Sequence, residues 1–134
     1  MIWNFDDYKN KIAMRDEFGL EITYAQLEDL GKEIAAGIGT RCLVFSFCEN
    51  SIGSVVGYTA FVNNGIVPVL LNSHMDRELF DNLIMKYKPS YLWLPVSQES
   101  DFEKYQVMKT MEIYDYVLLK TSFDMEYSLH EDLC

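Results

Sequence analysis

Two residues in this sequence could carry nucleophilic chemistry, Cys48 and His74. Cys48 follows the apolar run Cys42–Phe47 and precedes a polar turn, a position between a strand and a helix that can activate a thiol. His74 follows a second apolar run, so the two side chains could meet at one sheet edge as a Cys-His dyad. No G-x-S-x-G pattern surrounds Cys48, and an inert buried cysteine is the commoner state. A structural cysteine is the favoured interpretation, and a small Cys-His hydrolase is kept as an alternative.

Two further features could serve a metal or a nucleotide, but neither has the spacing that such sites need. His74 and His130 have only scattered acidic residues near them, which is typical of surface or capping histidines. The stretch Gly37–Thr40 holds two glycines of a dinucleotide fingerprint, but it follows a predicted helix instead of a strand. We expect a helix to end there. The sequence therefore assigns no catalytic, cofactor-binding or metal-binding residue within the chain.

The overall charge argues against two classes of partner. Eleven basic and twenty-one acidic residues give a net charge of −10 at pH 7. Such a chain repels phosphate backbones and anionic lipid, and it offers no basic stripe that could displace counterions. We therefore expect neither a nucleic acid nor a membrane among its partners.

The cysteines and the first residues favour a reducing compartment. Cys42, Cys48 and Cys134 form an odd set without C-x-x-C spacing. Residues 1–7 carry acids where a signal peptide would need a basic start followed by an apolar run. These features predict a cytoplasmic protein.

One long uncharged stretch raises the question of a membrane span. The segment Asn50–Met75 contains no Asp, Glu, Lys or Arg and is long enough in principle to cross a bilayer. Asn63–Gly65 and Pro68 would break such a helix in its middle. A helix, a turn and a buried strand explain the same residues, so we expect a soluble core here.

The amino-terminal part predicts a hairpin and a capped helix. Short strands flank a tight turn at Gly19. Thr23 and Gln26 have the spacing of a capping box, which predicts that a helix over residues 24–38 starts directly after Thr23. Gly39 is placed to end that helix in a left-handed conformation.

The centre of the chain alternates between buried strands and helices. Strands are predicted at Cys42–Phe47, Val67–Leu71 and Tyr91–Leu94, with helices near residues 51–64 and 76–87. This alternation predicts a parallel sheet with right-handed crossovers, hence an α/β doubly wound fold with flanking helices. The length of 134 residues is that of one domain, so residues 1–134 are predicted to form a single unit.

The same periodicity predicts which side chains are buried and how the helices begin. Asn50 or Ser51 can cap the helix over 51–64, while Ser73 and Asp76 repeat the capping-box spacing before the helix over 76–87. Gly53 and Gly57 are expected to let their helix approach the sheet closely. The residues expected to be nearly inaccessible are Val44, Phe45, Val56, Val69, Leu83 and Leu92, and the helix faces expected to point inward include Val55, Leu79 and Tyr87.

Beyond Pro95 the periodicity weakens. The segment Val107–Leu119 suggests one or two strands. The acidic segment Asp124–Asp132 reads as a surface loop, and Leu133–Cys134 resembles the opening of another apolar strand.

An ordered set of short motifs resembles the AMP-forming, adenylate-forming family of acyl-CoA synthetases and amino-acid adenylating enzymes. The segment 21–27 (EITYAQL) is similar to the family's early L-T-Y-x-E-L signature. Further along, residues 42–47 match the family's V-A-I-x-L strand and residues 49–51 match its x-N-S/C turn. Residues 58–69 then match its A-x-L-K-A-G-A-V-P-V segment, and residues 88–92 match the family's continuation. Asn63-Asn64 replaces the usual Lys-Ala of this pattern, and Cys48 stands where many members have Pro or a small residue. The resemblance covers about residues 10–95.

The resemblance implies an N-terminal segment of such a ligase, ending before its phosphate loop. The family's Ser/Thr/Gly-rich loop, ribose-binding Asp and catalytic Lys match nothing in this sequence. In the parent enzyme, a fatty, aryl or amino acid would react with ATP and Mg²⁺ to give acyl-AMP and pyrophosphate. The acyl group would then pass to the thiol of coenzyme A or of a carrier protein. The chain alone is expected to be inactive and to bind no cofactor.

Other partners and functions follow from the same observations. The remainder of the parent enzyme is the expected main partner, and the chain alone could form a homodimer through a sheet edge that this remainder would normally cover. A free-standing α/β interaction or regulatory domain is the alternative from a different functional class.

Overall fold

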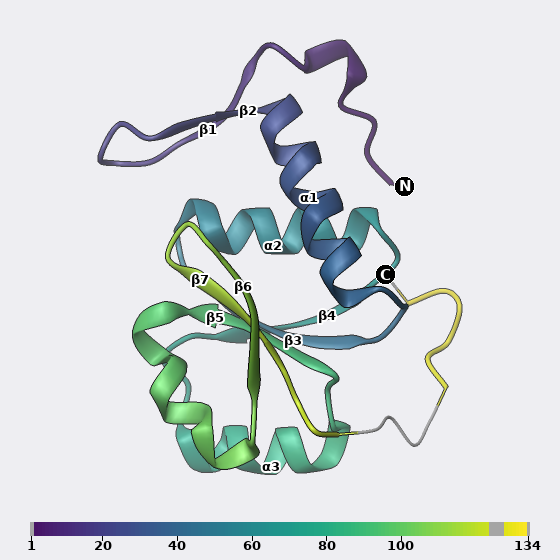
Figure 1. The fold of residues 1–134 in the computed structure, drawn as a ribbon, viewed down its shortest axis with the longest axis vertical. Helices are drawn as coiled ribbons and strands as arrows, with labels where there is room; N and C mark the ends of the chain where they lie inside the picture. The colour runs from purple at the N-terminus through teal and green to yellow at the C-terminus, as the bar shows by residue number, and fades with distance from the viewer. Residues whose placement is uncertain (1, 124–127, 134) are drawn as a thin grey trace.

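The computed structural model describes residues 2–123 and 128–133. Its elements alternate as the sequence predicts (Figure 1). In chain order they are η1 (Asp6–Tyr8), β1 (Ile12–Arg15), β2 (Glu21–Thr23), α1 (Tyr24–Ile38), β3 (Leu43–Cys48), α2 (Ile52–Asn63), β4 (Val67–Asn72), α3 (Arg77–Tyr87), β5 (Tyr91–Pro95), η2 (Val96–Tyr105), β6 (Met108–Ile113) and β7 (Tyr116–Lys120).

The main sheet has five strands in the order β4-β3-β5-β7-β6. β3 pairs in parallel with β4 and with β5, which confirms the predicted arrangement of the three central strands. The sheet as a whole is mixed, because β7, in the segment whose direction the sequence did not predict, runs antiparallel to both β5 and β6. The physical reason is a two-residue turn at Tyr114 and Asp115, whose positive φ angles of 47° and 62° close a tight hairpin that can only join antiparallel strands.

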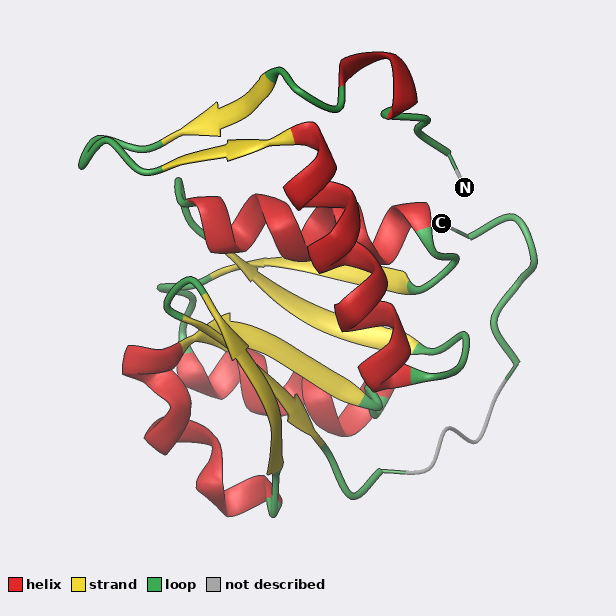
Figure 2. Ribbon diagram, turned by 45° about the horizontal axis from the view of Figure 1, so that its top comes forward, coloured by secondary structure: helices red, strands yellow, loops and turns green. Residues whose placement is uncertain are grey.

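Helices cover both faces of this sheet, with α1 and α2 on one face and α3 and η2 on the other (Figure 2). Each face has its own apolar cluster. Val44 and Val56 lie in the cluster beneath α2, while Phe45 and Leu92 lie in the cluster facing α3, and all four are fully buried as predicted. The molecule is therefore an α/β fold with a mixed sheet between two helical layers.

Four side chains that the sequence predicts to point inward are only partly buried or are exposed. Val69 is only partly buried, because β4 is an edge strand with no neighbour on its outer side in the described chain. Leu83 is also only partly buried, and Leu79 and Tyr87 are exposed, because α3 turns only the stripe of Phe80 and Ile84 fully inward. The apolar stripe read from the sequence is thus wider than the part of α3 that the sheet buries.

α2 differs from the predicted orientation at Val55, while Ile52, Val56 and Ala60 are buried as predicted. Val55 is 39% exposed, whereas Gly53 and Gly57 face the sheet. This helix is apolar on every side, so its periodicity alone does not select the inward face.

The helix ends follow their local signals with one exception. The Thr23 hydroxyl accepts the Gln26 N–H, the Gln26 side chain accepts the Thr23 N–H, and α1 ends at Gly39 with φ +78°. Ser51 caps α2. The prediction that Ser73 opens a capping box is wrong. Asp76 is the N-cap of α3 and accepts the Leu79 N–H, because the chain still turns at residues 73–74 before the helix begins.

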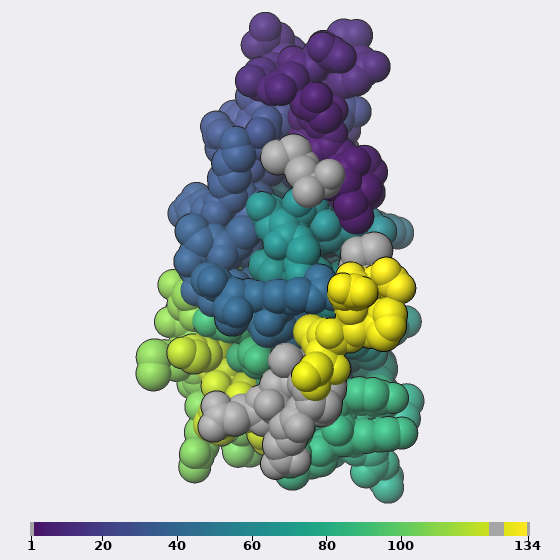
Figure 3. Space-filling model, turned by 90° about the vertical axis from the view of Figure 1, so that its right-hand side faces the viewer, coloured from purple at the N-terminus to yellow at the C-terminus, as the bar shows by residue number. Residues whose placement is uncertain are grey.

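The segment after β5 forms a 3-10 helix, η2, and then the β6–β7 hairpin, so the predicted one or two strands are two. The predicted loop over residues 124–132 falls partly outside the described residues, and its described part, 128–132, contains neither helix nor strand. Leu133 lies in no strand, and Cys134 falls outside the described residues. The described tail lies against the connection before β3, where the Arg41 guanidinium donates to the carbonyls of His130 and Leu133 (Figure 3).

No helix in the part of the chain that the structure describes is long and apolar enough to cross a membrane.

Candidate functional site

The carboxyl ends of the parallel strands are the place to look for a site, because open α/β sheets bind their ligands there. β3 ends at Cys48, β4 at Asn72 and β5 at Pro95, and the β6–β7 turn lies at the same end of the sheet (Figure 1). The N-terminus of α2 also opens at this end. The residues at this edge therefore determine what the fold could do chemically.

Cys48 and His74, the candidate dyad, both lie at this edge but make separate hydrogen bonds. The Cys48 thiol donates to the carbonyl of Ser46 at 3.5 Å. His74 is exposed in the turn after β4, where its backbone N–H donates to Asn72 Oδ1 at 2.8 Å. Among the described residues no hydrogen bond joins the thiol to the imidazole. The geometry thus gives no support to a Cys-His nucleophile.

Aromatic rings fill the space beneath α2 at this edge. A Cβ added to Gly53 would lie 2.6 Å from the Tyr116 ring, and one added to Gly57 would lie 2.5 Å from Cδ1 of the Trp93 indole. The Trp93 indole N–H donates to the Gly53 carbonyl at 3.1 Å. The predicted close approach of α2 to the sheet is confirmed, and the sheet beneath it holds rings rather than a cavity.

Polar groups at the start of α2 are satisfied by one another. The Ser54 hydroxyl accepts the Glu49 N–H at 3.3 Å, and the Ser51 hydroxyl accepts the Ser54 N–H at 3.3 Å. The Tyr116 hydroxyl donates to the buried Phe47 carbonyl at 2.9 Å, and burial raises the pKa of Tyr116 above its ordinary value. Tyr116 is therefore a neutral structural donor at physiological pH and not a ready proton acceptor.

Arg77 connects α3 to η2, and sequence reasoning missed it. Its guanidinium lies 4.9 Å from the Phe102 ring centroid and 5.9 Å from that of Phe47, while Nη2 donates to Gln98 at 3.3 Å and to Asp101 at 3.2 Å. Nη1 is buried without a protein hydrogen-bond partner among the described residues and faces these rings instead. The only available signal was a basic residue at the first position of a helix, which is too common to single out.

Two shallow grooves flank η2. One, of about 310 Å³, is lined by Arg77, Phe80, Asp81, Asp101, Phe102, Lys104 and Tyr105. Its charged groups are paired, because Asp81 accepts from both Lys104 and Tyr105 and Asp101 pairs with Arg77. The other groove, of about 380 Å³, mixes apolar residues with Glu99, Glu103 and Lys109. The charged side chains of the first groove thus bind mainly one another, whereas a ligand pocket needs polar groups that converge on the ligand.

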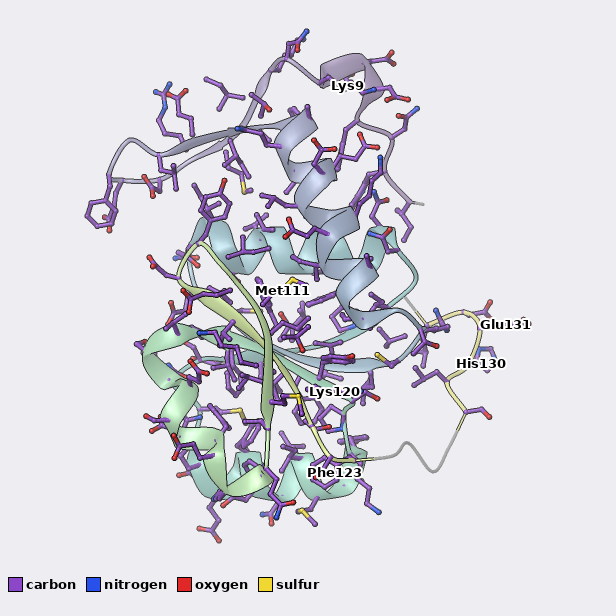
Figure 4. All side chains as sticks on the ribbon, in the orientation of Figure 1. Lys9, Met111, Lys120, Phe123, His130 and Glu131 are labelled. Carbon is purple, nitrogen blue, oxygen red and sulfur yellow. The ribbon has the colours of Figure 1, made fainter. Side chains whose placement is uncertain are left out.

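The remaining candidates lie apart from this edge. His130 is exposed on the carboxyl-terminal segment and accepts the Asp132 N–H through Nδ1 (Figure 4). Over residues 2–123 and 128–133 no cluster of His, Cys, Asp or Glu could hold a metal ion. Comparison with known proteins found no family model that matches this chain and no significant match among curated proteins.

Proposed function

We propose that this chain is the N-terminal part of the large domain of an AMP-forming acid ligase and that it is inactive by itself. The observation that carries the proposal is the ordered set of motifs between residues 21 and 92. Each short match is common in isolation, but the order and spacing of the whole set are much less so.

The positions of these motifs in the fold support the proposal without deciding it. The 21–27 motif spans β2 and the first turn of α1, and the 49–51 motif is the cap of α2. The 58–69 motif joins the end of α2 to β4 through Gly65, whose φ is +73°. These three motifs thus lie where one element ends and the next begins, whereas the 42–47 motif forms most of β3.

Residues 2–123 and 128–133 offer no cradle for ATP phosphates. Such a cradle needs backbone N–H groups in a glycine-containing turn between a strand and a helix N-terminus. The described glycines with positive φ are Gly19 in a hairpin turn, and Gly39 and Gly65 after the carboxyl ends of α1 and α2. Helix carboxyl ends expose carbonyl groups, which repel phosphate. ATP and Mg²⁺ therefore belong to the remainder of the proposed parent enzyme.

For that parent we propose the family's reaction, in which a fatty, aryl or amino acid is activated as acyl-AMP and transferred to the thiol of coenzyme A or a carrier protein. A cytoplasmic location fits this substrate set and the odd cysteine count. The role of this chain would be structural, since it would supply one helical layer, the central strands and a second helical layer against which the catalytic remainder packs.

Two measurements test the proposal. ATP-dependent pyrophosphate exchange by the pure chain, with mixed fatty, aryl and amino acids, is expected to stay at background. Robust exchange by a preparation free of longer protein would overturn the inactive-fragment proposal. Reading the coding sequence beyond Cys134 is expected to reveal a glycine-rich Ser/Thr loop followed by Lys, and a stop codon there would instead favour a free-standing interaction domain.

The interaction-domain alternative has one observation in its favour. Phe18 is highly exposed at the tip of the β1–β2 hairpin. The tip is closed by the Asp16 carboxylate, which accepts the N–H groups of Phe18 and Leu20. An exposed aromatic side chain on a turn that hydrogen bonds hold in place is a common contact residue for a protein partner.

A further inference from the structure

β4 is an outer strand of the five-stranded sheet, and its outer edge is open in the described chain. In a parallel pair, the N–H and C=O groups of alternate residues point to opposite sides of the strand. The Val67 N–H donates to the Cys42 carbonyl beside β3 at 3.0 Å, so the backbone of Val67, Val69 and Leu71 faces β3. The backbone of Pro68, Leu70 and Asn72 therefore faces outward.

This outer edge has a defined hydrogen-bonding pattern. Pro68 offers only a carbonyl, because proline has no backbone N–H. Leu70 offers both an N–H and a C=O group. Asn72 offers its N–H. A second strand can thus pair best when it runs antiparallel and is centred on Leu70.

The side chains along the same edge are apolar and uncharged. Leu70 is 52% exposed on the α2 side of the sheet, because Val67, Val69 and Leu71 take the side facing α3. The whole stretch from residue 50 to residue 75 contains no Asp, Glu, Lys or Arg. In a chain of net charge −10, two copies meet with least repulsion at a surface that carries no charge.

The opposite edge of the sheet has features that oppose pairing. β6 carries Lys109 and Glu112, which pair with each other at 2.8 Å. Its register with β7 shifts between Lys109 and Met111. Charged side chains and irregular register are devices by which proteins protect an edge strand. The structure therefore distinguishes two edges that the sequence could not separate.

We propose that a second copy of this chain pairs with the outer edge of β4, antiparallel and across a two-fold axis at Leu70. Leu70 exchanges both of its backbone hydrogen bonds with Leu70 of the second copy. The Asn72 N–H donates to the Pro68 carbonyl of the second copy on each side of the axis. Because Pro68 has no N–H, pairing that extends beyond Pro68 would lack a hydrogen bond at that residue. This favours a register centred on Leu70. The inference rests on the edge alone and does not depend on the proposed relationship to ligases.

The pattern is self-complementary, as a two-fold interface requires. The outward groups are the Pro68 carbonyl, both backbone groups of Leu70 and the Asn72 N–H, and each of them finds a partner in the second copy. The Asn72 carbonyl already accepts the Met75 N–H of its own chain. The exposed Leu70 side chains then lie opposite each other, with Cα atoms about 5.5 Å apart. The two sheets become one continuous sheet through the β4 strands.

Light scattering and sedimentation of the pure chain over a range of concentrations test the proposal. The wild type is expected to show a concentration-dependent dimer. Leu70→Lys should shift the dissociation constant upward by at least tenfold, because it places two like charges opposite each other. The matched control Met108→Lys, at a residue of β6 that is 69% exposed, should leave dimerisation unchanged.

A second measurement locates the axis. Leu70→Cys treated with a short bismaleimide should give a covalent dimer well above the background of the wild type, which carries three cysteines, and Met108→Cys should not. This arm also decides the question if Leu70→Lys disturbs folding. A chain that stays monomeric throughout, or a dimer that Met108→Lys dissolves and Leu70→Lys does not, overturns the proposal.

Discussion

Gly57→Ala is the substitution for which the structure predicts the sharpest effect. The added methyl group would lie 2.5 Å from Cδ1 and 2.7 Å from Cε2 of the Trp93 indole. Trp93 is completely buried and also packs against Phe61 and Tyr116, so its ring cannot swing aside. Relief requires α2 to move off the sheet, which would weaken the hydrogen bond from Trp93 to the Gly53 carbonyl.

The magnitude follows from three opposing contributions. Replacing glycine by alanine inside a helix stabilises it by about 1 kcal/mol. Overpacking a rigid core costs about 1 to 3 kcal/mol or more, and a weakened buried hydrogen bond costs about 1 kcal/mol. Because Trp93 has no free space, the upper end of the overpacking range applies. We expect Gly57→Ala to lower the free energy of unfolding by about 2 to 3 kcal/mol.

Gly31→Ala is the matched control, because it makes the same chemical change in a helix interior without a clash. A Cβ at Gly31 would lie 3.5 Å from Ala60 Cα, an ordinary contact. Only the helix-propensity gain of up to about 1 kcal/mol remains. Urea denaturation should move the midpoint down by on the order of 1 M for Gly57→Ala and slightly up for Gly31→Ala, with equal slopes. Equal shifts in the same direction for both variants would refute the packing of α2 against Trp93.

Three further predictions concern hydrogen bonds and pH. Thr23→Ala should lower the unfolding free energy by about 1 kcal/mol in thermal or urea unfolding, because it removes half of the capping box, and Thr23→Ser should retain most of the stability. Tyr116→Phe leaves the buried Phe47 carbonyl without its donor and should lower the free energy of unfolding by about 1 to 3 kcal/mol. The control Tyr58→Phe, at an exposed position, should change that free energy little. Equal effects of the two substitutions would contradict the buried hydrogen bond. Burial raises the pKa of both Cys42 and Tyr116, so at alkaline pH the unfolded chain loses these protons before the folded chain does. The free energy of unfolding should therefore fall as pH rises above the ordinary pKa of each group, about 8.5 for the thiol and about 10 for the phenol. Cys42→Ala should remove the earlier part of this alkaline loss, and an unchanged pH profile would contradict the assignment.

Local signals were sufficient wherever one short segment determines its own conformation. The capping box at Thr23 and the stop at Gly39 use residues within one or two turns of each other, so their geometry can be read without the rest of the chain. The three apolar runs became parallel strands because α2 joins the first to the second and α3 joins the second to the third, and each helix is long enough to cross back over the sheet. The α/β class followed from this alternation.

The candidate site was predicted in part. The sequence placed Cys48 at the carboxyl edge of the sheet, where β3 ends. It could not tell that the Cys48 thiol bonds to its own strand, or that Arg77 lies over Phe102, because residues 25 apart meet there only after η2 folds back on α3. The ligase relationship itself rests on motif order and remains a proposal.

The amino-acid sequence by itself determined the elements from β1 to β5, most of their ends and the charge-free stretch from residue 50 to 75, since these depend on neighbours along the chain. Only the tertiary structure decided that β7 inserts antiparallel beside β5, that Val55 points away from the sheet, and that β4 is left as an open edge. The physical reason is that such choices depend on which distant side chains compete for the same space. A helix that is apolar on every side, like α2, acquires an inward face only when Trp93 and Tyr116 occupy the sheet beneath it.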